Sequence, residues 1–201
     1  MSVLTTAIHS ALESLFRLTG NYGWTILLLT LGVRFLMLPL SFWQQRTAKA
    51  TAAIQSAARE IQERYAGEEA QKKLQELYGR SGWSMLAGCL PTLLQWPIFM
   101  AMYGALSSFP FAVPATFLWL ENLAAPDPYF ILPLLAVATS VWQTWASVPR
   151  QQRLTLMILP VLFGLFMVKA SAALALYWVS GNIISLIQYY LLGRRGAAAS
   201  L

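Results

Sequence analysis

A single arginine, Arg34, lies inside a long apolar run, and this charge restricts the possible folds more than any other feature. The run covers residues 22–42 and has no other charged side chain. A transmembrane helix needs about 20 apolar residues to cross a hydrocarbon core roughly 30 Å thick. At about 1.5 Å per residue, Arg34 would lie roughly 18 Å from Tyr22, past the midplane. An arginine there costs about 2.5–3.5 kcal/mol on insertion scales, so we expect it to have a function.

The composition is that of a membrane protein rather than a soluble one. Of 201 residues, 57% are hydrophobic and only 11% are charged. The only cysteine, Cys89, excludes an internal disulfide and a cysteine-based metal site. The only histidine, His9, argues against haem ligation, a zinc protease and a Ser–His intramembrane protease. The net charge of +6 arises from basic residues that lie where membrane topology places them, so we expect no nucleic-acid partner.

The apolar runs predict one all-α membrane domain with five transmembrane helices. An amphipathic helix on the membrane surface is expected before them, over residues 1–20, because apolar side chains recur there at helical spacing. A short cytoplasmic tail, 193–201, is expected after them, and no signal peptide is expected. The predicted spans are 22–42, 86–107, 129–147, 154–168 and 172–192.

The distribution of lysine and arginine predicts the orientation. With Arg34 set aside, one side of the membrane carries two basic residues, Arg17 and Lys169. The other side carries eleven, seven of them in the segment 43–84. The positive-inside rule therefore places the N-terminus outside and the C-terminus in the cytoplasm.

The polar segment 43–84 is predicted to be a cytoplasmic helical hairpin. Apolar side chains mark two helical stripes, separated by Gly67, and oppositely charged pairs such as Glu60 and Arg64 are spaced i,i+4. Two interpretations have equal weight. The hairpin binds a partner, or it is a solvated linker whose stripes pack only on each other.

Polar side chains follow single faces of several predicted spans. Polar groups inside a membrane turn away from lipid, towards protein or water, so these faces could surround one wet concavity with Arg34 as its only charge. Ordinary explanations exist: Gln95 more simply bonds a carbonyl freed by a proline, serine and threonine often pack helices, and Tyr177 and Trp178 could be packing aromatics. The stripes contain Thr30 and Arg34; Gln95; Ser140 and Gln143; and Tyr177, Ser185 and Gln188.

The chain contains the motifs NYGWTILLLTLGVRFLMLPL, GCLPTLLQWPIFMAMY, FLWLENLAAPDPYFILPLL and LYWVSGNIISLIQ. Together these four motifs resemble the YidC-type membrane protein insertases, whose relatives work in mitochondria and thylakoids. The resemblance runs from about residue 21 to 192, in the family's order and spacing. It implies a five-helix core with a hydrophilic groove open to the cytoplasm and lipid. It places the groove arginine on Arg34, a groove threonine on Thr30, a groove glutamine on Gln143 and an aromatic pair on Tyr177 and Trp178.

The resemblance implies insertion of membrane proteins with short translocated tails, in a bacterial plasma membrane. Arg34 is expected to attract acidic residues of the substrate, without bond chemistry, catalytic residues, metal or cofactor. The expected partners are nascent membrane proteins and the lipid bilayer, with the Sec translocon, the ribosome and the signal recognition machinery as further candidates. The alternative is a small-anion channel or transporter with Arg34 as its selectivity site.

Overall fold

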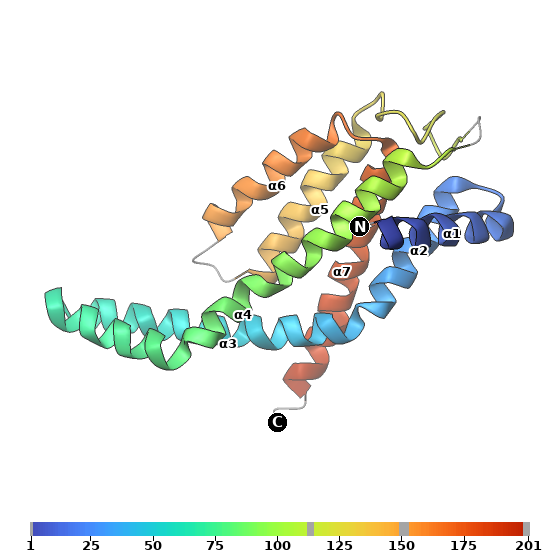
Figure 1. Ribbon diagram of the computed structural model, residues 1–201. Coiled ribbons are helices and arrows are strands. Elements are labelled where there is room, and N and C mark those ends of the chain that lie inside the picture. Colours follow the sequence, from blue (N-terminus) through green and yellow to red (C-terminus); the bar gives the residue numbers. More distant parts are fainter. Residues whose placement is uncertain (1, 112–114, 149–152, 199–201) are drawn as a thin grey trace. The chain divides into compact units, whose positions relative to one another are not determined.

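The chain folds into helices, as a computed structural model shows for residues 2–111, 115–148 and 153–198 (Figure 1). Within this part, side chains at 2, 44–49, 52, 80–95, 147, 155 and 192–198 are not described. The described residues contain no strand. The helices are α1 (Ser2–Thr19), α2 (Tyr22–Leu36), α3 (Leu38–Arg64), α4 (Gly67–Ser108), α5 (Ile131–Ser147), α6 (Arg153–Met167) and α7 (Ala172–Ala198).

The helices form two compact units. One unit contains residues 1–37 and 98–201, and the other contains Leu38–Pro97. In the first unit, α7 contacts both α2 and α5, α6 packs on α5, and α1 packs on α2. The all-α prediction is therefore confirmed, whereas the membrane orientation stays a prediction.

The predicted span 22–42 is not one continuous helix. The first helix ends at Leu36, and a turn at Met37 separates it from α3. Pro39 explains the break, because proline lacks the N–H that would bond the carbonyl four residues earlier and its ring clashes with that carbonyl. Arg34 therefore belongs to the last turn of α2.

The predicted boundary between the hairpin and the second span, near residue 85, is not a helix boundary. Helix α4 continues from Gly67 to Ser108. Among the described helices, α7 alone is long and apolar enough over Ala172–Leu191 to cross a membrane. Three apolar helices are shorter and cover Tyr22–Leu36, Ile131–Ala146 and Leu156–Met167, so the five-span count remains a prediction.

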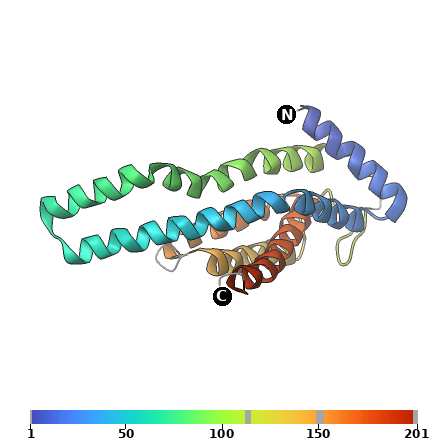
Figure 2. The same ribbon diagram turned by 90° about the horizontal axis from the view of Figure 1, so that it is seen from below.

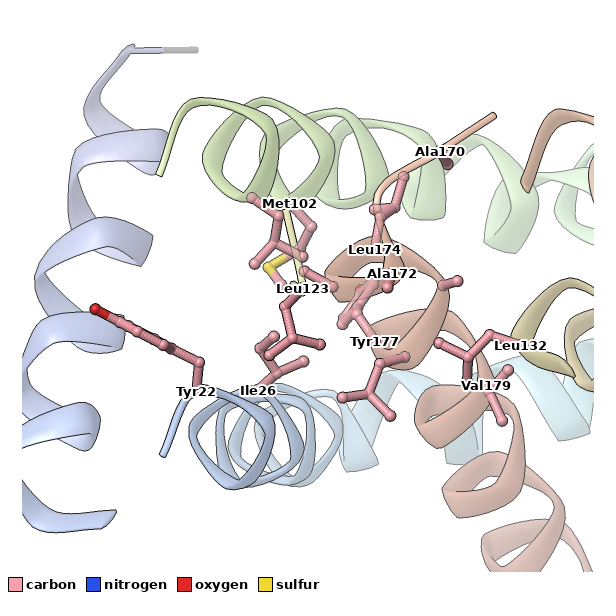
Figure 3. Packing of buried hydrophobic residues seen from close by; sticks show 14 of the residues in the cluster. Tyr22, Ile26, Met102, Leu123, Leu132, Ala170, Ala172, Leu174, Tyr177 and Val179 are labelled. Atoms are coloured by element: carbon pink, nitrogen blue, oxygen red, sulfur yellow. The ribbon is translucent and has the colours of Figure 1, made fainter. Parts of the chain in front are cut away.

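The core of the first unit is apolar and surrounds the beginning of α7. Residues 172–177 of α7 are all buried. They pack with Ile26 of α2 and Met102 near the end of α4, as Figure 3 shows. Helix α1 contributes Leu12 to the same cluster and stacks Phe16 on Tyr22, with ring centroids 4.0 Å apart. Gly20, with φ of +65°, lets the chain turn from α1 into α2.

The second unit is a helical hairpin whose turn lies at Gly67, and its place in the cytoplasm stays a prediction. Helix α3 and the first part of α4 run antiparallel (Figure 2). Gly67 adopts a φ of +61°, which glycine tolerates without steric cost. Glu60 and Arg64 form an ion pair of 2.7 Å, and the Lys73 ammonium lies 4.2 Å from the Tyr65 ring centre. An open hollow of about 390 Å³ lies among these residues and their neighbours.

Candidate functional site

Arg34 projects from α2 onto the surface of α7 at Gly181. A Cβ atom at position 181 would lie 2.8 Å from Arg34 Nη2 and 3.3 Å from Nε. The guanidinium group therefore occupies the space that a side chain at position 181 would fill. Gly181 itself is buried. The absence of a side chain on α7 lets a charged group lie directly against the helix.

The Arg34 guanidinium has no acidic partner. Among the described residues, the only ion pair joins Glu60 and Arg64 in the hairpin unit. No described residue forms a hydrogen bond with Arg34, and the only enclosed side-chain polar atom without a partner there is Gln55 Oε1. The Arg34 nitrogens are therefore not fully enclosed, and they lie against α7 without a hydrogen-bond partner among the described residues.

Tyr177 lies one helical turn before Gly181 on α7. Its side chain is only 3% exposed and belongs to the core (Figure 3). Because residues four apart share a helix face, Tyr177 lies on the face of α7 that Arg34 meets at Gly181. The Tyr177 hydroxyl has no hydrogen-bond partner in the described part of the chain and is not enclosed. Tyr177 and Arg34 thus place two polar groups without described hydrogen-bond partners on the same face of α7.

Ser140 and Trp178, both predicted to line a groove, form a polar contact between α5 and α7. Trp178 Nε1 donates to Ser140 Oγ at 3.0 Å. Asn182 Nδ2 donates to Ser140 Oγ at 2.8 Å and to Thr139 Oγ1 at 3.1 Å. The Trp178 ring also packs on Phe163, with centroids 4.1 Å apart. These hydrogen bonds and the ring contact link α7 to α5 and α6.

Thr30, one turn before Arg34, points into the protein. Its side chain is fully buried, and its hydroxyl donates to the Ile26 carbonyl of its own helix at 2.7 Å. A hydroxyl bonded in this way slightly destabilises and often bends its helix. In this structure the Thr30 hydroxyl is not available to a ligand.

The remaining predicted site residues are more peripheral. Gln143, Ser185 and Gln188 are half-buried, and Gln143 takes part in an interaction with another group. The Gln95 side chain lies outside the described residues. The structure therefore brings Arg34 together with Tyr177, and Ser140 together with Trp178. Gly181 and Asn182 were not predicted as site residues, although Gly181 lies between Tyr177 and Ser185 at four-residue spacing on the same helical face.

The fold and the site are those of a class of helical protein with an arginine held among its apolar helices. No carboxylate partner of this arginine lies among the described residues. Comparisons with known proteins agree with this class. The family described as "60Kd inner membrane protein" matches residues 14–198. The chain therefore belongs to this family, which contains the YidC-type membrane protein insertases.

Individual relatives support the same assignment. "Membrane protein insertase MisCA" of Bacillus subtilis is 38% identical over 88% of this chain and 72% of its own length. "Membrane protein insertase YidC" of Helicobacter pylori is 35% identical over 91% of this chain. This chain spans only 35% of that relative's length. A crystal structure described as an active YidC insertase has a TM-score of 0.74 and 26% identity, covering 94% of this chain and 46% of the other.

Proposed function

We propose that the protein is a membrane protein insertase that moves short polar tails of single- or double-spanning proteins across the bilayer. The tails pass through a hydrophilic groove open to the cytoplasm and to lipid. The observation that carries the proposal is the Arg34 guanidinium, which lies against α7 without a carboxylate partner or a hydrogen bond among the described residues. Helix packing alone does not require such a charge.

The physical task of an insertase is to lower the cost of taking polar groups through hydrocarbon. Each unsatisfied backbone group costs several kcal/mol there, and an isolated charge costs more. A wet groove that reaches partway across the membrane lets the tail keep its water for part of the path. Burial of the substrate's apolar segment in lipid then favours completion of the transfer, so no through-pore is required.

Arg34 attracts acidic residues of the substrate tail in this scheme. A pair of unit charges 4 Å apart attracts by about 4 kcal/mol at an effective dielectric constant near 20, against about 1 kcal/mol in water. Because guanidinium presents its donors in a planar fork, it binds a carboxylate with two parallel hydrogen bonds. The attraction remains small enough for the tail to be released.

The other predicted residues divide into two roles. Tyr177, Gln143, Ser185, Gln188 and Gln95 are proposed to line the groove or its cytoplasmic mouth. The buried contacts of Ser140, Trp178 and Thr30 support a role in fixing the positions of α2, α5 and α7 around it. None of these residues forms or breaks a bond in the proposed function.

The proposed setting is a bacterial plasma membrane, spanned by five helices with the N-terminus outside and the hairpin in the cytoplasm. Exposed apolar side chains on α2 support a lipid-facing surface: Trp24, Leu28, Leu31 and Phe35 share one face of the helix. Nascent membrane proteins are the substrates. The Sec translocon, the ribosome and the signal recognition machinery are candidate partners of the exposed hairpin.

The proposal is tested with the protein in liposomes and a single-spanning substrate whose short translocated tail carries two aspartates. The unaltered protein is expected to protect the tail from external protease, and Arg34→Ala is expected to protect much less. Arg17→Ala is the matched control, because it removes an exposed positive charge from α1. Anion flux without tail protection would instead support a small-anion channel, which the descriptions of the relatives do not favour.

A further inference from the structure

We propose that Gly181 is a positioning residue for Arg34: the bare surface of α7 at this glycine fixes where the guanidinium lies and leaves its hydrogen-bond donors free. The inference rests on the proposed insertase function. It adds a residue of α7 that does not itself contact the substrate and acts only through Arg34.

The contact is a steric one that involves the whole guanidinium group. A Cβ at position 181 would lie within 3.5 Å of three Arg34 atoms, Nη2, Nε and Cζ. These distances are shorter than, or at the limit of, ordinary van der Waals contact, so any larger residue at this position must move the guanidinium. The contact joins α2 and α7, which pack directly on each other.

Holding a charge by contact differs from holding it by hydrogen bonds. The neighbouring polar groups of α7 are occupied, since Asn182 and Trp178 both donate to Ser140. Arg34 has no such bond among the described residues. Packing against Gly181 therefore restricts the guanidinium without using any of its five N–H donors in a hydrogen bond to a described residue.

A single methyl group at position 181 tests this arrangement without disrupting the fold. The atoms that it meets are at the end of a flexible side chain, so the guanidinium moves rather than the backbone. Alanine also has a higher helix propensity than glycine. Moving the guanidinium to ordinary contact increases the charge separation by at most about 1 Å, from about 4 to about 5 Å, which at an effective dielectric constant near 20 weakens binding roughly fourfold.

The experiment compares two substrates that differ only in their short tails, one with two aspartates and the other with two asparagines. Each is added to liposomes that contain unaltered protein, Gly181→Ala, Arg34→Ala or the double variant. Gly32→Ala is the matched control, because a Cβ there meets no atom within 4 Å and the position lies on the same helix as Arg34. The insertion rate is measured as the protease-protected fraction over time.

Gly181→Ala is expected to insert the aspartate tail roughly fourfold more slowly and the asparagine tail at the unaltered rate. Gly32→Ala is expected to insert both tails at the unaltered rate. The double variant is expected to be no slower than Arg34→Ala, since the glycine acts only through the arginine. Unaltered insertion of the aspartate tail by Gly181→Ala, or equal slowing of both tails, would overturn the positioning role. If the unaltered protein inserts neither tail, the proposed function itself fails.

Discussion

The buried carboxylate of Asp127 accepts a hydrogen bond from the indole Nε1 of Trp119 at 3.2 Å. Asp127 is only 3% exposed, and its other oxygen accepts from the backbone N–H of Leu132 at 2.7 Å. The residue therefore caps the start of α5, whose N-cap position, Phe130, has no capping side chain. The same loop supplies the carbonyls of Leu123 and Ala125 to the first N–H groups of α7. This loop thus supplies hydrogen-bond acceptors to N–H groups at the starts of two helices, α5 and α7.

Replacing Asp127 with asparagine is expected to destabilise the protein. Both carboxylate oxygens accept bonds from N–H donors, so the new amide places one N–H group against another donor. An unsatisfied buried donor costs about 1–3 kcal/mol, which predicts a lower midpoint of thermal unfolding in detergent. Glu121→Gln is the control, because Glu121 is exposed in the same loop. Equal midpoints for the two variants would show that the cap does not contribute to stability.

The contact between Asn182 and Ser140 is expected to couple α5 and α7 energetically. Hydrogen bonds between helices in membranes contribute about 0.6 kcal/mol on average and at most about 1.7. A double-mutant cycle of Asn182→Ala and Ser140→Ala should give a coupling energy in this range, measured by reversible unfolding in mixed micelles. Purely additive effects would mean that the two helices are held by packing alone.

Two glycines of the hairpin unit are expected to respond in opposite directions to alanine. Gly67 has a φ of +61°, where a Cβ costs roughly 1 kcal/mol, so Gly67→Ala should loosen the turn. Gly79 lies inside α4 with open space around it, so Gly79→Ala should stabilise the helix by up to about 1 kcal/mol. Hydrogen exchange of residues 50–79 in the full chain measures both changes. Faster exchange in both variants would contradict the prediction that alanine at position 79 stabilises α4.

The sequence predicts the helices well where apolar runs and turn residues agree. The all-helical fold follows from composition, and the hairpin turn follows from Gly67, because glycine is the residue that tolerates positive φ. The break at Met37 could have been predicted from Pro39. The apolar content of 22–42 concealed it, because hydropathy reports burial in lipid but not the continuity of a helix.

The contacts of the candidate site could not be predicted from spacing. Helical periodicity places Thr30 and Arg34 on one face but does not say which neighbour covers each turn. In the structure Thr30 is fully buried, whereas the Arg34 guanidinium reaches α7. The roles of Gly181 and Asp127 depend on residues far away in the chain, so only the folded arrangement reveals them.

Two substitutions at Tyr177 distinguish the packing of its ring from the polar role of its hydroxyl. A hydrogen bond contributes about 0.5–1.5 kcal/mol, and the hydroxyl makes none within the described residues, so Tyr177→Phe should change the free energy of unfolding by less than about 0.5 kcal/mol. Tyr177→Ala removes a ring that is only 3% exposed, and loss of a large buried side chain costs about 3–5 kcal/mol. Thermal unfolding in detergent measures both values. A large loss for Tyr177→Phe would mean that the hydroxyl is held by a partner, and the polar space beside Arg34 would then be smaller than we infer.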